Sequence, residues 1–591
     1  MLAVGSLGGL VYQEGINYNK GNGKGGGSVR KRIPVGYEDM KRLIDGDMYY
    51  VDKTLMIKEL IDMAGSVNLY IRPRRFGKTL NLSMLRRFFE MEMGDDGSRI
   101  DNSYIFDNLK ISSYGDVYMS HQGQYPVINL SLKSAKQPTY ENAFKCLRDE
   151  IAAEFGRHDY VLGTDSMTEH EKKRFKMIME WKAEDIEYAR ALEFLSGCLA
   201  KYHGRNVIIL IDEYDVPLEN AYFEGFYDDM ITFMRSLFES ALKTNPNLEF
   251  AVITGCLRIS RESIFTGLNN LEVFSVLSPG YADCFGFTEG EVKEMLAYYG
   301  LECKFEELKH WYDGYQFGSA EIYNPWSIVN YIKTATIDFH AYPKAYWSNT
   351  SSNHIIRELV EEADFETREE IEKLIAGEAI EKPVHEDITY GDIRESADNL
   401  WNFLYFTGYL KKSGEKQVQE IIYLDLSIPN AEIRSIYRNT ILTWFDKKIR
   451  KTDMSSLFAA MENGDCETIG RFISDQLLDT ISFFDYAENY YHGFLTGLLK
   501  TSQKYSVYSN RESGTGRSDI ILRTPSVRGG AVILELKVAR DFGKMEAACK
   551  EALLQIEEKD YAASLRSDGY SNIKKYGICF YRKECLVMKK G

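Results

Sequence analysis

The segment Arg72–Thr79, with the sequence RPRRFGKT, contains the residue types that hold the phosphate groups of a nucleotide. It follows the apolar run Asn68–Ile71 and precedes a stretch whose apolar residues recur at helical spacing. In a strand, loop and helix of this order, backbone N–H groups at the helix N-terminus bind phosphate oxygens. We therefore expect Lys78 to reach the β- and γ-phosphates and the Thr79 hydroxyl to bind Mg²⁺. The residues expected to form this nucleotide site are Arg75, Phe76, Gly77, Lys78 and Thr79.

One position departs from the general phosphate-loop pattern, which has glycine where this sequence has Arg72. A GKT triplet by itself is a weak signal, since the same letters occur at an ordinary turn before a helix. The apolar strand before the loop and the helical spacing after it favour nucleotide binding over such a turn.

A set of acidic residues follows the apolar run Val207–Ile211, in the sequence Asp212-Glu213-Tyr214-Asp215. An apolar strand that ends in acidic residues places carboxylates at the carboxyl edge of a buried sheet, where α/β proteins bind ligands. We expect Asp212 to contact Mg²⁺ through water and Glu213 to polarise the water that attacks the γ-phosphate. The alternative is a strand that merely ends in solvated charges, which is less favoured in a domain that also contains GKT.

The run Phe250–Thr254 predicts a further strand of the same sheet. Its last residue, Thr254, is expected to sense the γ-phosphate. Arg258 and Arg261 lie just beyond and could reach a phosphate in the same chain or in a neighbouring copy. For either arginine, an ordinary surface position is the stronger alternative, and Arg258 is retained as the candidate.

Near the C-terminus, two strand patterns contain carboxylates and a lysine. The run Arg517–Leu522 contains Asp519. After a turn rich in proline and glycine, the run Ala531–Val538 contains Glu535 and Lys537 on one face, because side chains alternate along a strand. If the two strands pair as a hairpin, Asp519 lies on the same face as Glu535.

This pairing would form a metal site suited to hydrolysis of a phosphodiester. The carboxylates of Asp519 and Glu535, with the carbonyl of Leu536, are oxygen ligands of the kind that Mg²⁺ or Mn²⁺ prefers. Lys537 beside the ion can orient a water molecule and stabilise charge that develops on a phosphate. An E-x-K sequence alone is common on solvated edge strands, but here aliphatic residues flank it, and unpaired charge is costly among them.

The helices next to these strands contain further polar candidates. Glu488 and His492 stand one helical turn apart before the strands, and Gln555 lies in the helix that follows them. All three could be surface residues. Glu488 and Gln555 are retained as candidate catalytic residues.

The charge of the chain is distributed unevenly. Its 591 residues are too many for one hydrophobic core, so we expect about three domains. The net charge of −16 argues against a protein coated with nucleic acid over its whole surface. From Lys500 to Gly591, however, 18 Lys and Arg stand against 11 Asp and Glu, a balance of +7 that leaves −23 for the remainder. This asymmetry suggests a polyanion site near the C-terminus, although surface charge also varies without a function.

The remaining composition predicts a cytoplasmic protein without membrane contact. No apolar run approaches the roughly 20 residues of a membrane span. The nine cysteines are scattered without a CxxC pair, which fits reduced thiols and argues against disulfides or a zinc site. The N-terminus has no basic lead and no convincing cleavage site, so we expect no secretion signal.

Changes in pattern divide the chain into segments. We expect a flexible, glycine-rich tail over 1–31 and a three-layer α/β domain with the phosphate loop over 32–287. A helical lid or middle region is expected over 288–410, a connecting region over 411–466, and another α/β domain over 467–591.

Several motifs together resemble one known family. They are RPRRFGKT, LIDEYDVPL, ITGCLRISRESIFTGLNNL, WYDGYQFG, YNPWSI, FLYFTGYL, LSIPNAEIR, GRSDIIL and AVILELK. From about Ile33 to its end, the chain resembles the bacterial AAA-ATPase-like proteins with a C-terminal PD-(D/E)xK nuclease domain, in which arginine also replaces the first glycine of the phosphate loop. The resemblance implies an AAA-like ATPase domain, a helical lid that includes Trp311–Phe317, and a restriction-endonuclease-like α/β core. The site residues that it carries over are Lys78, Thr79, Asp212, Glu213, Asp519, Glu535 and Lys537.

Motifs and resemblance together predict a protein that binds and hydrolyses ATP and whose nucleotide state controls a Mg²⁺-dependent phosphodiesterase. Its substrate is expected to be DNA rather than RNA, and arginines that act between copies would require a homo-oligomer. One alternative is a nucleotide-dependent switch in defence or signalling whose nuclease-like domain binds nucleic acid without cutting it. Another is a structural or toxin-like module with a degenerate GKT loop.

Overall fold

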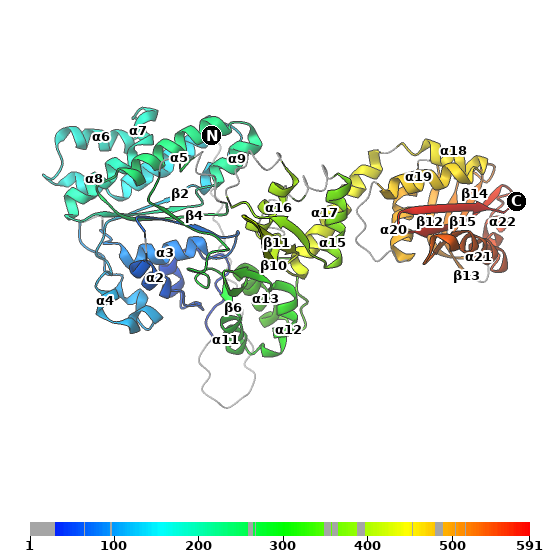
Figure 1. Ribbon diagram of the computed structural model, residues 1–591, viewed down its shortest axis with the longest axis horizontal. Helices are drawn as coiled ribbons and strands as arrows, with labels where there is room; N and C mark the ends of the chain where they lie inside the picture. Colours follow the sequence, from blue (N-terminus) through cyan, green and yellow to red (C-terminus); the bar gives the residue numbers. More distant parts are fainter. Residues whose placement is uncertain are drawn as a thin grey trace, which may run out of the picture.

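The computed structural model consists of three bodies arranged in a row (Figure 1). An α/β body is followed by a smaller middle body and by a second α/β body that contains the C-terminus. The structure describes residues 30–63, 65–94, 97–257, 264–265, 268–347, 356, 364–386, 396–451, 453–478, 488–500, 502, 504–513 and 516–590. The tail predicted over 1–31 therefore lies almost wholly outside the described residues, and so do Arg258 and Arg261.

The first α/β body is built on a five-stranded sheet in which all neighbouring strands are parallel. In the order β2-β3-β4-β1-β5, the strands are Val127–Ser131, Val207–Asp212, Leu248–Gly255, Val67–Ile71 and Leu271–Phe274. Every residue of β1 and β3 is buried, which explains their unbroken apolar runs. The sheet confirms the predicted α/β class of this domain.

Helices cover both faces of this sheet and complete the predicted three layers. They are α1 Met40–Asp45, α2 Leu55–Met63, α3 Lys78–Phe89, α4 Asp116–Met119, α5 Tyr140–Arg157, α6 Glu169–Met179, α7 Asp185–Ala189, α8 Ala191–His203, α9 Val216–Glu224 and α10 Tyr227–Phe238. Figure 1 shows α5 and α8 above the sheet and α2 and α3 below it. Helix α3 buries Leu82, Leu85 and Phe89, so the helical spacing after GKT is confirmed.

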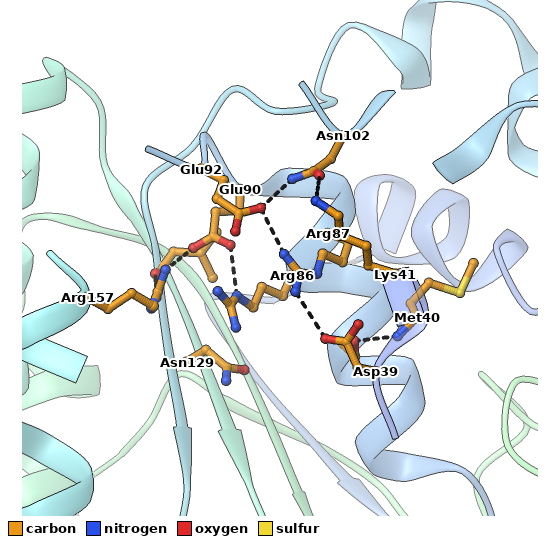
Figure 2. Close-up of polar contacts among 12 residues, drawn as sticks. Asp39, Met40, Lys41, Arg86, Arg87, Glu90, Glu92, Asn102, Asn129 and Arg157 are labelled. Carbon is orange, nitrogen blue, oxygen red and sulfur yellow. Dashed lines mark hydrogen bonds and ion pairs between the residues drawn. The ribbon is translucent and has the colours of Figure 1, made fainter. Parts of the chain in front are cut away.

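A network of buried charges connects the C-terminal end of α3 to α5 (Figure 2). Glu90, which is only 4% exposed, accepts hydrogen bonds from Arg86 and Arg157. Arg157 also pairs with Glu154. Burial raises the pKa of Glu90 and of Glu154. Arg157, together with Arg86 at Glu90 and His158 at Glu154, outweighs burial and holds both pKa values below their ordinary value. The network therefore anchors the helix whose other end carries the GKT sequence.

Replacing Arg157 by methionine is expected to destabilise this body by about 3–5 kcal/mol, because Glu154 would stay buried without Arg157 and Glu90 would keep only Arg86. Native-state hydrogen exchange of the α5 and β2 amides measures this loss locally. The matched control is Arg190→Met. Arg190 pairs with Glu193 at the surface, so its loss is expected to cost less than about 1 kcal/mol. Equal protection of α5 in the two variants would contradict the anchoring role of the network.

The same network predicts how stability depends on pH. Carboxyl groups whose pKa is lowered by folding bind protons more weakly in the folded chain than in the unfolded chain. Glu90 and Glu154 therefore stabilise this body fully above the ordinary pKa of 4.5, and their contribution decreases as the pH falls below that value. Urea unfolding midpoints across this pH range check the sign, and the decrease toward low pH is expected to be smaller in Arg157→Met, which lacks the cation shared by both carboxylates.

The middle body combines helices with two small antiparallel sheets, where the sequence predicted mainly helices over 288–410. Its strands are β6 Phe287–Thr288, β7 Tyr315–Phe317, β8 Ala320–Tyr323, β9 Ile380–Pro383, β10 Lys411–Val418 and β11 Ile421–Ser427. Its helices are α11 Glu289–Tyr299, α12 Phe305–Tyr312, α13 Pro325–Ile337, α15 Phe365–Ala376, α16 Ala397–Phe406 and α17 Ala431–Lys451.

The segment Trp311–Phe317, predicted as part of a helical lid, ends α12 and begins the hairpin of β7 and β8. Gly314 has a φ of 98°, a backbone conformation that favours glycine, and it turns the chain from helix into strand. After it, burial alternates from one residue to the next, which is the period of a strand and not of a helix.

The segment 411–466, predicted to connect two domains, is instead divided between two bodies. Strands β10 and β11 pair with each other and with β9 in the middle body. Helix α18, Ser455–Asn463, packs Leu457 and Met461 into the core of the last body, together with Ile578 of its sheet. These partners lie far apart along the chain, so local patterns did not indicate the division.

The last body has a five-stranded mixed sheet with helices on both faces. In the order β12-β13-β14-β15-β16, the strands are Ser506–Ser513, Gly516–Arg523, Ala531–Val538, Ile573–Tyr581 and Glu584–Lys589. The helices after α18 are α19 Cys466–Leu478, α20 Glu488–Leu499, α21 Met545–Glu558 and α22 Ala563–Ser567. Leu534 and the residues paired with it on the adjacent strands, Ile520 and Tyr576, pack toward α20. Ile533 packs toward α21. The predicted α/β class is confirmed, with β12 and β16 as additional outer strands.

Across the described part of the chain, no helix combines the length and apolar character that crossing a membrane requires.

Candidate functional site

The phosphate loop predicted over Arg72–Thr79 joins the end of β1 to the start of α3. Gly77 immediately precedes α3 with a φ of 87°, in the left-handed region that favours glycine. Arg75 also has a left-handed backbone, with a φ of 70°. These two residues let the chain turn within the loop and bring it to the N-terminus of α3, where backbone N–H groups are available to an anion.

Lys78, the first residue of α3, is buried among acceptors of the loop itself. Its Nζ donates to the carbonyl oxygens of Arg72 and Pro73 at 2.7 and 2.9 Å. The same atom lies 3.3 Å from Sγ of Cys256, just beyond β4. Because the carbonyl oxygens carry no formal charge, the ammonium group retains its attraction for a phosphate.

Asp212 joins the side chains of two other predicted site residues. Its Oδ2 accepts a hydrogen bond from the Thr79 hydroxyl at 2.7 Å, and its Oδ1 accepts one from the Thr254 hydroxyl. The three residues come from the starts or ends of different elements, and the order β3-β4-β1 places these ends side by side. The structure therefore brings Thr79, Asp212 and Thr254 together at the carboxyl edge of the sheet.

Two further acidic residues follow Asp212. Glu213 lines a cavity beside the loop, and burial, followed by the charge of Asp212, raises its pKa. Asp215, to which the sequence analysis assigned no role, is 3% exposed and accepts hydrogen bonds from two successive backbone N–H groups after β4, at 2.8 and 3.1 Å. It holds the start of the segment that leads to Arg258. The second carboxylate of the DExD sequence was the signal that could have identified it.

Arg72, which departs from the general loop pattern, has a structural role. Its side chain is fully buried and donates to the carbonyl oxygens of Phe274 and Tyr281, at 2.7 and 3.2 Å. The guanidinium group also lies 5.2 Å from the ring centre of Phe317. Arg72 thus connects the end of β1 to the segment after β5 and to the β7–β8 hairpin, which glycine could not do.

A cavity of about 360 Å³ lies beside the loop. Its walls include residues of the loop, Glu213, the segment 34–53 and the start of α13. Lys53, Lys133 and Lys136 also line it and were not predicted from the sequence. Lys133 and Lys136 follow β2, and their position after a buried strand was the available signal. Lys53 pairs with Glu291 and Lys133 with Glu38, so their charges are partly offset.

In the last body, Asp519 and Glu535 lie next to each other on β13 and β14. The residues of these two antiparallel strands are paired as far as Ile520 and Leu534. Beyond it, the Asp519 carboxylate accepts a hydrogen bond from the Leu536 N–H at 2.8 Å. The Asp519 N–H lies 3.4 Å from the Glu535 carboxylate. The structure therefore brings together the two acidic residues that the predicted hairpin required.

Lys537 and Gln555 complete a set of contacts around Glu535. Lys537 Nζ donates to Gln555 Oε1 at 2.7 Å, and Gln555 Nε2 donates to the Glu535 carboxylate. Glu535 is 2% exposed, and burial, followed by the charge of Asp519, raises its pKa to about 8. A buried acid beside a second carboxylate is a setting that a divalent cation would relieve, because the cation offsets their repulsion.

Two family models match the parts of the chain that contain these sites. A model described as predicted AAA-ATPase matches residues 34–265, and a model of the PD-(D/E)XK nuclease superfamily matches residues 486–590. The chain contains both domains. It thus combines an AAA-ATPase-like domain on a parallel sheet with a nuclease-superfamily domain, two classes that generally use a nucleotide and a divalent metal.

Similar proteins were found among curated sequences and solved structures. An uncharacterized protein in the vnfD 5′ region of Azotobacter chroococcum mcd 1 is 26% identical over 415 residues, which are 70% of each chain. The ORC2 protein of Aeropyrum pernix, solved as ADPNP and ADP complexes, aligns with 66% of this chain and 92% of its own, at 9% identity and a TM-score of 0.24. A superposition at that score does not bear on function.

In the nuclease domain, α20 brings two more predicted residues toward β13. His492 Nε2 lies 3.1 Å from the Asp519 carbonyl oxygen and 3.1 Å from the Ser509 hydroxyl. Its contact is therefore with the backbone of β13, which makes it a support for the strand. Glu488 is exposed at the start of α20. Its charge also contributes to the raised pKa of Glu535, although burial and the charge of Asp519 are larger causes. A role for the Leu536 carbonyl as a metal ligand stays a prediction.

Proposed function

We propose that this protein binds and hydrolyses ATP, and that its nucleotide state controls a Mg²⁺-dependent phosphodiesterase that acts on DNA. The observation that carries the proposal is the convergence of Asp519 and Lys537 on the buried Glu535 of the nuclease domain. The contacts of Thr79 and Thr254 with Asp212 in the ATPase-like domain of the same chain support the nucleotide half.

In the ATPase-like domain, the loop and Lys78 would bind the phosphates. Thr79 and Asp212 would hold Mg²⁺, which would neutralise charge on the β- and γ-phosphates. Glu213 would orient and polarise the attacking water, a role that its raised pKa favours because a more basic carboxylate accepts a proton more readily. Thr254, which lies in β4 and is hydrogen-bonded to Asp212, would sense the γ-phosphate.

In the nuclease domain, Asp519 and Glu535 would hold Mg²⁺, or Mn²⁺, which would polarise the scissile phosphate. Lys537 would orient the attacking water and stabilise the charge that develops on phosphate oxygens. Gln555 would position both groups, since its amide bonds the ammonium of Lys537 and the carboxylate of Glu535. Each of these side chains already has a partner that restricts its rotation.

The proposal that the substrate is a nucleic acid rests on charge. Residues 500–591 have a balance of +7 in a chain whose net charge is −16. A basic region around a site for phosphodiester hydrolysis favours a polyanion, and binding to it is expected to weaken as salt rises. The acidic remainder would repel DNA and direct it to the nuclease domain.

A structural route joins the nucleotide cavity to the nuclease domain. Ser327, next to the cavity wall on α13, donates to the fully buried carboxylate of Glu432 at 2.7 Å. Glu432 also accepts the Trp347 N–H at 2.9 Å. It lies in the first turn of α17, whose 21 residues span about 30 Å. Helix α17 also contacts α20 of the nuclease domain. A shift of α13 on nucleotide binding would therefore reach the helix that supports β13.

The variant Ser327→Ala is expected to reduce the effect of ATP on DNA cleavage at least about tenfold, because it removes a buried hydrogen bond to a charged group. Cleavage without ATP is expected to stay at the wild-type level. The matched control is Ser196→Ala, which removes a buried hydroxyl bonded within α8. An unchanged ATP effect in Ser327→Ala would contradict this route.

Incubation of the full chain with supercoiled plasmid, in Mg²⁺ or Mn²⁺ and with or without ATP, tests the proposed function. The expected result is metal-dependent nicking or linearisation whose rate changes with ATP. Binding of DNA without cleavage under every condition would contradict the nuclease activity and favour a nucleotide-dependent switch. Cleavage that is the same with and without ATP would contradict nucleotide control.

A further inference from the structure

Part of the wall of the cavity beside the phosphate loop is apolar and has no role in phosphate binding. It includes Leu43 and Val51 of the N-terminal segment, with Met295 of α11 and Val329 of α13. These apolar side chains cannot neutralise phosphates. A nucleotide whose phosphates bind Lys78 would bring its base into the same cavity, and bases bind well to apolar and aromatic surfaces.

Trp326 contributes an aromatic ring to this wall at the start of α13. Its Nε1 donates to the Tyr346 carbonyl oxygen at 3.3 Å, which orients the ring. Its backbone is held on both sides, because Asn324 caps α13 and Ser327 is bonded to the buried Glu432. The ring is therefore held in place before any ligand binds, which lowers the entropic cost of stacking on it.

The guanidinium group of Arg75 lies over the Trp326 ring, 4.5 Å from its centre. Arg75 comes from the phosphate loop, so the contact joins the loop to α13 at the cavity wall. A planar guanidinium group and a planar base bind an indole face in similar ways, by stacking and by electrostatic attraction. The Arg75 contact thus identifies a ring face that a flat group can cover.

We propose that Trp326 is the platform on which the purine base of the nucleotide stacks, in the position that Arg75 takes on the ring. This inference rests on the nucleotide binding proposed above. The base replaces the guanidinium group, and Arg75 becomes available to the phosphates bound by its own loop. Because a purine covers more of an indole than a pyrimidine does, the platform favours ATP and GTP over CTP and UTP.

Equilibrium binding of three probes to the full chain tests the platform: ATP, CTP and inorganic tripolyphosphate, which has phosphates but no base. In Trp326→Ala, the affinity for ATP is expected to fall about tenfold, the size of loss seen when a base loses an aromatic partner. The affinity for tripolyphosphate is expected to stay unchanged, and the preference for ATP over CTP to shrink. Trp326→Phe keeps an aromatic face and is expected to retain most of the affinity.

Intrinsic fluorescence adds a readout that a purely structural role would not change. Stacking of a base on Trp326 is expected to quench its emission, so the change on adding ATP should disappear in Trp326→Phe. The control is Trp181→Phe, because Trp181 follows α6 and is 58% exposed, and it is not among the residues that line the cavity. That variant is expected to show the wild-type change.

Equal losses of affinity for ATP and tripolyphosphate in Trp326→Ala would overturn the platform, because the ring would then only support the loop. An unchanged affinity for ATP would overturn it as well. Both results would leave nucleotide binding itself intact. A wild-type chain that binds neither ATP nor tripolyphosphate would instead overturn the proposed function, and the platform with it.

Discussion

The Asp519→Asn variant is expected to cleave DNA at least about a hundredfold more slowly than the wild type in Mg²⁺, while it hydrolyses ATP at the wild-type rate. Asparagine preserves the size of the side chain and an oxygen that can accept the Leu536 N–H. It removes one of the two negative charges proposed to hold the cation, so metal affinity falls. Cleavage of labelled duplex DNA and release of phosphate from ATP, measured on the same preparation, separate the two activities.

The matched control for this variant is Asp568→Asn in the same domain. Asp568 pairs with Arg523 at 3.0 Å, and its side chain is 54% exposed. Its replacement is expected to leave cleavage unchanged. If Asp519→Asn cuts DNA as fast as the wild type, the site built on Asp519 and Glu535 does not perform the reaction, even if the protein is a nuclease.

Replacing Lys78 by alanine is expected to lower the affinity for ATP at least about a hundredfold and to abolish hydrolysis. The ammonium group is the only cation bonded to the loop carbonyls of Arg72 and Pro73 among the described contacts, and it lies where the phosphates would bind. Its loss removes charge-assisted hydrogen bonds to the β- and γ-phosphates. Titration with ATP and a steady-state hydrolysis assay measure both effects.

The nuclease activity of Lys78→Ala is informative as well. Cleavage without ATP is expected at the wild-type rate, and the effect of ATP on cleavage is expected to be absent. Lys182→Ala is a suitable control, because Lys182 is 69% exposed in its side chain and pairs with Glu180 at the surface. Hydrolysis by Lys78→Ala at the wild-type rate would show that the phosphate loop is assigned wrongly.

Patterns in neighbouring residues predicted the parts of both sites that are local in the chain. A buried strand, a loop with GKT and a helix were recognisable from the spacing of apolar residues, and β1 and α3 confirm that order. The two-residue period of a strand placed Glu535 and Lys537 on one face. Pairing of β13 with β14 across a short turn then brings Asp519 to Glu535, as the hairpin pattern indicated.

Contacts between distant segments could not be predicted in this way. Arg72 stood out in the sequence as a departure from the loop pattern, yet its partners include carbonyl groups at the end of β5 and after it. Lys133 and Lys136 follow a strand with no recognised motif, and only the neighbouring positions of β2 and β3 bring them to the cavity. Strand β7 after Gly314 has only three residues, a run too short to be recognised as a strand from the sequence.

The sequence by itself determined the chemical groups of this protein and their local geometry: a lysine and a threonine at a helix start, carboxylates at strand ends, and a carboxylate pair with a lysine on adjacent strands. Those features depend on covalent geometry and on the period of the backbone. Only the tertiary structure decided which groups meet, including Thr254 with Asp212, Gln555 with Lys537, and Trp326 with Arg75. These meetings depend on how apolar faces far apart in the chain bury one another, and that information is spread over the whole fold.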